Sequence, residues 1–289
     1  MEGKAMKSSP ARTKVTLPRV VTREKWLKER VAFLEKEKRF TKLRDAHNAD
    51  RRRLPMVEIT EPYVFDGPEG DVSLLDLFDG RNQLIVYHFM WRWKNGQPLK
   101  DPCPSCSAWA DHVARGHLTH LRMRDTNLVL ISRAPFDRIR PFKKRMGWSI
   151  PWYSSAGNRF NYDFHVSFDE SIAPISYNYR SKKAWMKQPW IAEMIKEDQP
   201  FDLHGMSCFL RDGDRVFHTY SSYGRGAEGV GGANYFLDFT ALGRQEPWEK
   251  PEGRILNPGF QAGSGRMPYP DEFKTYAKLA PGKIRKGRS

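Results

Sequence analysis

The stretch QLIVYHFMWRWKNGQPLKDPCPSCSAWADH, residues 83–112, decides the fold of this chain. It begins with a near-continuous apolar run, residues 83–90, of the kind that forms a strand buried on both faces. A loop of twelve residues follows, and then Cys103 and Cys106 stand two residues apart where a helix is expected to begin. The cysteines are a redox pair, half of a metal site or two inert buried thiols.

The rest of the core follows the same pattern. A second apolar run, NLVLISR at residues 127–133, precedes an expected helix across residues 135–146, which Pro141 would bend or restart. Strand, helix, strand and helix in this order predict parallel strands joined by right-handed crossovers. The runs MSCFL and RVFHTYS then flank turn residues 211–214 and predict an antiparallel hairpin. We therefore expect an α/β protein with a central mixed sheet flanked by helices.

The chain also divides into segments along its length. Residues 1–20 are expected to be a disordered basic tail, and residues 21–55 an amphipathic N-terminal helix with a narrow apolar stripe. Residues 56–245 form the main domain, with an aromatic, turn-rich insertion at about 147–200. Residues 246–289 form a proline-rich basic extension. We expect the long helix to pack on the body of the chain or on a second subunit in a homodimer.

The formal net charge of +15 is concentrated at the two ends of the chain. Residues 1–55 carry a net charge of +10 and residues 266–289 one of +5, so the segment between them is neutral. Charge runs without a fold signature carry little specificity, so we do not expect specific nucleic-acid binding. No apolar run approaches the ~20 residues of a bilayer span, so no membrane span is expected. The three cysteines suit a reducing compartment, and we expect a cytoplasmic protein.

The position of the cysteine pair favours redox chemistry. A thiolate, not a thiol, attacks a disulfide, so a working cysteine needs a pKa below its ordinary value. The N-terminus of a helix supplies free amide donors and the positive end of the helix dipole, and Cys103 is placed to receive both. Cys106 follows one helical turn later, close enough to form a disulfide or to resolve a mixed one. Pro104 suits the first helical position, where its missing N–H is not needed.

Two other interpretations of the pair stay open. Zinc needs four ligands, and Cys103 and Cys106 are followed by His112, His117 and His120, although these spacings are short for a zinc finger. The pair could also be two inert buried thiols. In both cases the protein would be a non-catalytic module that binds a partner or a small molecule. The sequence contains no Walker loop, GxSxG or HExxH motif, and we expect no bound cofactor.

Several aromatic and polar residues near the pair have more than one interpretation. Cys208 lies in an apolar run and is expected to be a small buried hydrophobe, with a third redox thiol as the alternative. His88 is expected to be a hydrogen-bonded core histidine, although it could tune the charge of the cysteines. Trp91, Trp93 and Trp109 are expected to be core or lid residues that shield the sulfurs.

Seven stretches, taken together, resemble one family. They are RRRLPMV, DGPEGDVSLLDLFDGRNQLIVYHFM, CPSCSAWAD, LVLISRAPFDRIRPFKKRMGWSIPWYSS, FNYDFHVSF, FLRDGDRVFHTYSSYGRG and FLDFTALGR, in this order. In them the chain is similar to the thioredoxin-like proteins catalogued as domain of unknown function 899, which are described as predicted dithiol-disulfide oxidoreductases. The resemblance extends over most of the chain.

The resemblance implies a thioredoxin-like fold and, through Cys103 and Cys106, an enzyme of disulfide exchange. Cys103 would attack a disulfide or a peroxide, Cys106 would resolve the intermediate, and an external thiol reductant would close the cycle. Thioredoxins carry a cis-proline just before the hairpin, facing the cysteines, whereas residues 203–207 of this chain contain no proline. We therefore expect substrates to dock differently, with the loop at residues 91–102 and the insertion enclosing the site.

Overall fold

The computed structural model describes residues 17–197, 199–227 and 269 of the chain. The expected basic tail, apart from residues 17–20, and the expected C-terminal extension, apart from Tyr269, lie outside the described residues. The described residues fall into two compact units, one reaching to Asp50 and the other comprising residues 51–227 and Tyr269. No helix in the described ranges combines the length and the apolar character needed to cross a bilayer.

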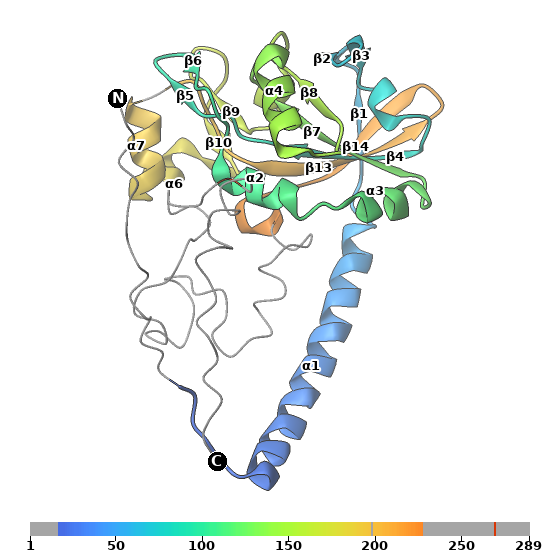
Figure 1. The fold of residues 1–289 in the computed structure, drawn as a ribbon, viewed down its shortest axis with the longest axis vertical. Coiled ribbons are helices and arrows are strands. Elements are labelled where there is room, and N and C mark those ends of the chain that lie inside the picture. The colour runs from blue at the N-terminus through green and yellow to red at the C-terminus, as the bar shows by residue number, and fades with distance from the viewer. Residues whose placement is uncertain (1–16, 198, 228–268, 270–289) are drawn as a thin grey trace. The chain divides into compact units, whose positions relative to one another are not determined.

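The long N-terminal helix is present as α1 (Arg23–Arg51), shown in blue in Figure 1. Thr22 precedes it, and the Thr22 hydroxyl oxygen accepts a hydrogen bond at 3.3 Å from the backbone N–H of Lys25, which satisfies one free donor of the first turn. The apolar side chains of its stripe are exposed, among them Trp26, Val31 and Leu34.

The remaining helices of the described residues are short. They are η1 (Asp76–Phe78), α2 (Pro104–Asp111), α3 (Arg115–Arg122), α4 (Phe136–Met146), α5 (Phe160–Asp163), α6 (Lys182–Trp185), α7 (Pro189–Glu197) and η2 (Gly224–Ala227). A single helix was expected where α2 and α3 occur, and the extended backbone of Ala114 separates the two. In contrast, α4 continues through Pro141 without a break.

Eight strands form the central sheet of the described residues. In spatial order they are β1 (Val57–Ile59), β14 (Arg215–Tyr223), β13 (Gly205–Asp212), β4 (Gln83–His88), β7 (Thr126–Ser132), β8 (Trp152–Ser154), β2 (Val64–Gly67) and β3 (Gly70–Ser73). Three smaller antiparallel pairs join β5 (Trp93–Lys94) with β6 (Gln97–Pro98), β9 (Ser167–Phe168) with β12 (Phe201–Asp202), and β10 (Ser176–Tyr177) with β11 (Arg180–Ser181).

The strand directions confirm the thioredoxin-like fold. β4, β7 and β8 run parallel, whereas β13 is antiparallel to β4 and β14 is antiparallel to β13. The helices α2 and α3 connect β4 to β7, and α4 connects β7 to β8, as parallel strands require. The order β7-β4-β13-β14 is the thioredoxin-like core. One strand of the expected insertion, β8, extends this sheet.

Two apolar clusters of buried side chains cover opposite faces of the sheet. Side chains of a strand alternate between the two faces, so Tyr87 and Phe89 face one cluster while Leu84 and Val86 face the other. The first cluster includes residues of α2, α3 and α4, and the second includes residues of η1 and α5. The helix that carries the cysteines therefore packs on the Tyr87 face.

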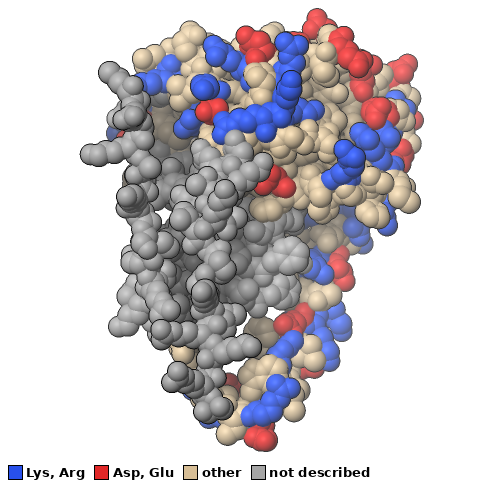
Figure 2. All heavy atoms as spheres, viewed as in Figure 1, with Lys and Arg blue, Asp and Glu red and all other residues tan. Residues whose placement is uncertain are grey.

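The outer side of α4 is strongly basic. The helix buries Ile139 and Phe142 against the sheet and leaves Arg138, Arg140 and Lys144 exposed. Figure 2 shows Lys and Arg side chains gathered over the face where α4 lies. Among the described residues, no acidic side chain forms an ion pair with these three.

Asp202 in β12 is a buried carboxylate that ties separate segments together. Its carboxylate accepts hydrogen bonds from Nε of Arg133 at 3.0 Å, from Oγ of Ser167 at 2.7 Å and from the indole N–H of Trp93 at 2.7 Å. The guanidinium of Arg133 also lies over the ring of Trp93, 3.7 Å from its centre. Because Trp93 belongs to the loop at residues 91–102, this charge pair holds that loop on the body of the protein.

Replacing Asp202 with alanine leaves the Arg133 charge buried without its partner. Removing one member of a buried ion pair typically costs about 3–5 kcal/mol, so the free energy of unfolding should fall by about that amount. Urea denaturation measures it. The exposed Asp71→Ala serves as the control and should change stability by less than about 0.5 kcal/mol. A loss as small as the control's would show that the pair does not fix the loop.

Four hydrogen-bonded side chains cross three strands on the face opposite Tyr87. His218 contacts Ser221 at 2.7 Å, Ser221 contacts Ser207 at 2.7 Å, and Ser207 contacts Nε2 of His88 at 2.8 Å. Burial, followed by the nearby His218, lowers the pKa of His88 to about 3. Burial also lowers the pKa of His218. Both imidazoles are therefore neutral at neutral pH.

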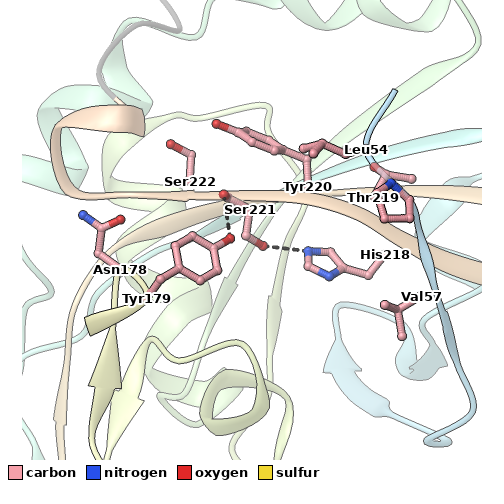
Figure 3. A pocket seen from close by; sticks show the side chains of 10 residues that line it. Leu54, Val57, Asn178, Tyr179, His218, Thr219, Tyr220, Ser221 and Ser222 are labelled. Atoms are coloured by element: carbon pink, nitrogen blue, oxygen red, sulfur yellow. Dashed lines mark hydrogen bonds between the residues drawn. The ribbon is translucent and has the colours of Figure 1, made fainter. Parts of the chain in front are cut away.

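His218 and Ser221 also line a cavity of about 440 Å³ beside β14 (Figure 3). Tyr179 also lines it and donates its hydroxyl to the backbone carbonyl of Ser221 at 3.1 Å. Neither Cys103 nor Cys106 is among its lining residues. This cavity is therefore separate from the cysteine pair.

Buried His88 should make stability depend on pH. An unfolded histidine titrates near pH 6.5, so below that pH the unfolded chain binds a proton that the folded protein refuses down to about pH 3. The contribution of neutral His88 to the free energy of unfolding is therefore complete above about pH 6.5. It falls as the pH drops, by about 2 kcal/mol between pH 7 and pH 5. Urea denaturation of the wild type and His88→Gln at both pH values measures it. An equal loss in both proteins would contradict the assignment.

Candidate active site

The loop at residues 91–102 carries the chain from the end of β4 to the cysteines. Within it β5 and β6 form a hairpin, and its two turn residues, Asn95 and Gly96, have positive φ angles of 51° and 71°. This is the backbone conformation that an Asn-Gly pair favours in a two-residue hairpin turn. The indole N–H of Trp91 donates to the carbonyl of Leu99 at 2.8 Å and holds the two ends of the loop together.

Cys103 and Cys106 lie together at the first turn of α2. Cys103 is the N-cap residue, with extended backbone, and Pro104 occupies the first helical position. The backbone N–H and the hydroxyl of Ser107 both donate to the carbonyl of Cys103, at 3.1 and 3.0 Å. Both cysteines are free thiols, with Cys103 half-buried and Cys106 buried. Cys103 is therefore the more accessible sulfur.

The two sulfurs have opposite electrostatic environments. A hydrogen bond from Cys106 lowers the pKa of Cys103 to about 7, against the opposing effect of burial, and the backbone N–H groups of Cys106 and Ser105 contribute further. Burial raises the pKa of Cys106 well above its ordinary value, and the charge of Cys103 adds to this. Near neutral pH the pair therefore holds one proton on Cys106 and a substantial population of thiolate on Cys103.

Tyr87 of β4 is a candidate site residue that the sequence analysis missed. Its hydroxyl donates to the sulfur of Cys106 at 3.5 Å, and its ring stacks on Trp109 of the same helix, with centroids 3.8 Å apart and planes within 5°. Burial raises the pKa of Tyr87 well above its ordinary value, so the phenol stays protonated and acts as a donor. Strand alternation could have found it, because its side chain points to the helix side of the sheet.

The position before β13 is occupied by His204. Its ring lies face-on to that of Tyr87 at 6.5 Å, and its backbone carbonyl accepts a hydrogen bond at 2.9 Å from the hydroxyl of Tyr177. Tyr177 belongs to the expected insertion. The peptide bond between Gln199 and Pro200 is cis, but it precedes β12 rather than β13. His204 therefore precedes β13 where no proline stands, and the insertion contacts it through Tyr177.

The zinc interpretation requires several metal-binding side chains close together. Within the described ranges, no three His, Cys, Asp or Glu side chains lie close enough together to hold a metal ion. His117 instead accepts a hydrogen bond at 3.1 Å from the backbone N–H of Ala114 at the start of α3. His112 and His120 are exposed.

The other residues considered from the sequence lie as follows. His88 points away from the cysteines, into the chain of hydrogen bonds with Ser207. Cys208 is half-buried, and burial raises its pKa to about 11, which keeps it a thiol at neutral pH. Trp91 is buried and Trp93 half-buried, and Trp109 stacks on the tyrosine beside Cys106.

The reactivity of Cys103 should follow the pH dependence of its thiolate. Its lowered pKa predicts that the rate of alkylation by iodoacetamide rises with pH, with a midpoint near 7, and levels off above it. Mass mapping should find Cys103 modified first, with Cys106 and Cys208 unmodified at neutral pH. A midpoint near 8.5, the ordinary value for a thiol, would contradict this environment.

Removing the Tyr87 hydroxyl should raise the pKa of Cys106 further. A net hydrogen bond of about 0.5–1.5 kcal/mol corresponds to a shift of up to about one pKa unit. The pH dependence of Cys106 alkylation, measured in a Cys103→Ser background with and without Tyr87→Phe, tests this. Tyr63→Phe removes a hydroxyl that donates to Asp163 at 2.8 Å and serves as the control. Equal effects of the two variants would remove Tyr87 from the site.

Comparisons with known proteins fall into two groups. Two similar solved structures are the peroxidoxin BcpB of Mycobacterium tuberculosis, at 14% identity, and the bacterioferritin comigratory protein of Xanthomonas campestris, at 8%. The first match covers 61% of this chain and 92% of that chain with a TM-score of 0.37, and the second covers 61% and 91% with a TM-score of 0.38. No curated protein matches the chain.

The sequence match to a protein family is far more extensive. The profile of the family described as "Bacterial protein of unknown function (DUF899)" matches residues 15–263. The match contains both cysteines, Tyr87 and every strand of the central sheet. It confirms the family resemblance seen in the sequence. The chain belongs to the DUF899 family of bacterial proteins.

Proposed function

We propose that this protein is a thiol-disulfide oxidoreductase in which Cys103 attacks and Cys106 resolves. The observation that carries the proposal is the contrast between the two sulfurs at the start of α2. The accessible sulfur has its pKa lowered toward neutrality, whereas the buried one keeps its proton. An attacking thiol is most effective when its pKa lies near the ambient pH.

The first step forms a mixed disulfide. The Cys103 thiolate attacks one sulfur of a substrate disulfide, an S–S bond forms to Cys103, and the other substrate sulfur leaves as a thiolate. Cys106 then loses its proton to solvent or to the departing thiolate and attacks the Cys103 sulfur. This releases the second substrate thiolate and leaves a Cys103–Cys106 disulfide. The substrate gains two electrons, which the cysteine pair loses.

Tyr87 assists the second step through its hydrogen bond to Cys106. Cys106 must become a thiolate in a buried environment that disfavours charge, and the Tyr87 hydroxyl donates to the sulfur that acquires it. A donor that stays protonated stabilises the thiolate without competing for its proton. Stacking on Trp109 holds the phenol in place.

A peroxide substrate is compatible with the same pair. The Cys103 thiolate would attack the peroxide O–O bond, become a sulfenic acid and release an alcohol or water. Cys106 would then condense with it, releasing water and giving the same disulfide. In both cycles an external thiol reductant returns the two electrons. We place this chemistry in the cytoplasm, where a reducing environment supports it.

The first experiment is to determine the reduction potential of the purified protein. It is equilibrated in defined thiol–disulfide buffers, free thiols are counted, and the bridge is located by mass mapping. A reversible Cys103–Cys106 disulfide within about −120 to −270 mV, the range of known oxidoreductases, supports the proposal. Absence of the disulfide, or zinc bound stoichiometrically to the cysteines, would instead favour a non-catalytic binding module.

Two variants test the roles of the sulfurs. Cys103→Ser should abolish disulfide reduction, because the attacking thiolate is lost. Cys106→Ser should still attack but cannot resolve, so a mixed disulfide should accumulate on Cys103 and be visible as an added mass. If the adduct instead accumulates on Cys106 in the Cys103→Ser variant, the two roles are reversed.

A further inference from the structure

Three basic side chains lie at or beside Asp101, two residues before Cys103. Arg92 donates from Nε to the backbone carbonyl of Asp101 at 3.2 Å, and Nη1 of Arg145 lies 3.3 Å from the Asp101 carboxylate. Lys100 stands next to Asp101 and is exposed. We call Arg92, Lys100 and Arg145 the basic rim. It draws on two separate segments, the loop before the cysteines and α4.

The contacts of Tyr269 show that the basic rim lies near Cys103. Its hydroxyl donates to the backbone carbonyl of Pro102 at 2.7 Å, directly before Cys103. Arg145 lies over the ring of Tyr269, 5.1 Å from its centre. Burial raises the pKa of Tyr269 to about 12, and the charges of Arg92, Arg145 and Cys103 all act on the same hydroxyl. Both guanidinium groups and the reactive sulfur therefore share one neighbourhood.

The positive charge of this region is not balanced locally. Residues 91–102 and α4 together contain eight basic residues and two acidic ones, Asp101 and Asp137. Asp101 is already engaged by Arg145. The rim continues into the exposed basic side of α4, which Figure 2 shows as a gathering of blue side chains. Residues 56–265 carry no net charge as a whole, so this excess of basic over acidic residues is local.

We propose that the substrate of Cys103 is an anionic disulfide, one that carries carboxylates beside its sulfurs. This inference rests on the proposed function and names its substrate class. A cluster of like charges at the mouth of a site raises the local concentration of oppositely charged ligands and speeds their encounter. Arginine also binds carboxylates through paired hydrogen bonds, which would orient the disulfide toward the sulfur.

The rim also assists the chemistry of the first step. When Cys103 attacks, the S–S bond of the substrate breaks and one substrate thiol leaves as a thiolate. Negative charge then moves from the Cys103 sulfur to the leaving sulfur, toward the approach side of the site. Guanidinium and ammonium groups already placed there stabilise that charge without rearranging. The rim therefore acts on both binding and the departure of the first product.

The experiment compares three small disulfides of different charge on the wild-type protein. Oxidised glutathione is anionic, 2-hydroxyethyl disulfide is neutral and cystamine is cationic. The rate of formation of the Cys103–Cys106 disulfide is followed for each by quenching and mass analysis. Raising the ionic strength from about 0.02 M to about 0.5 M shortens the screening length from about 20 Å to about 4 Å. With added salt, the rate of disulfide formation should fall for oxidised glutathione, stay the same for the neutral disulfide and rise for cystamine.

Charge-reversal variants locate the effect on the rim. Lys100→Glu and Arg145→Glu should each slow disulfide formation with oxidised glutathione several-fold, up to roughly tenfold. Each should speed disulfide formation with cystamine. Arg122→Glu reverses an exposed charge in the last turn of α3, a different helix from the one that begins at the cysteines, and should change neither rate. The three disulfides differ in leaving-group pKa, so the deciding quantity is the change in each rate rather than its absolute value. If Arg145→Glu fails to fold, Lys100→Glu and the wild-type salt series decide.

The outcomes separate this inference from the proposed function. Opposite responses of the anionic and cationic disulfides to salt and to the rim variants support it. Equal responses of all three disulfides overturn the inference but leave the oxidoreductase intact. If none of the three yields a Cys103–Cys106 disulfide while thiol counting shows Cys103 reduced and accessible to reagent, the proposed function fails, and the inference fails with it.

Discussion

The buried carboxylate of Asp202 determines where the loop before the cysteines can lie. That loop is short of apolar residues apart from its tryptophans, so hydrophobic packing alone would leave it several positions of similar energy. A buried charge with directed partners permits fewer arrangements, since each misplaced partner leaves a polar group unsatisfied. Arg133, Trp93 and Ser167 come from three different segments and meet at this one carboxylate. The placement of Cys103 therefore depends on a contact made far from the cysteine in sequence.

The alternation of side chains along β4 separates two environments within a single strand. Tyr87 points to the cysteine helix and His88 to a chain of hydroxyls and imidazoles on the opposite face. Among the described contacts, the only side chain of β4 that contacts the sulfur of Cys106 is thus Tyr87, whose phenol is neutral. The electrostatics of the pair come from the start of α2 itself, with its backbone donors, and from the hydrogen bond between the two sulfurs. A buried acid or base is not required to explain which sulfur holds the proton.

Much of the fold could be predicted from local patterns, because continuous apolar runs and turn residues report directly on buried strands and hairpins. The same patterns led to Cys103 at the start of a helix. The hairpin at Asn95 and Gly96 was missed although its Asn-Gly signal was present. Asp202 could not be predicted, since an acidic residue in a sequence normally indicates the surface and its burial depends on distant partners. Tyr269 could not be predicted either, because it contacts Pro102 across 167 residues.

That last contact bears on how the domain is delimited. By sequence pattern the domain ends near residue 245, yet the hydroxyl of Tyr269 rests on the peptide next to the reactive sulfur. A tyrosine of the C-terminal region is thus part of the wall of the cysteine site. A shortened protein ending at residue 245 would contain all eight strands of the sheet but would lose the hydrogen bond to the Pro102 carbonyl and the ring contact with Phe142. The strands of the central sheet therefore end well before the last residue that contributes to the cysteine site.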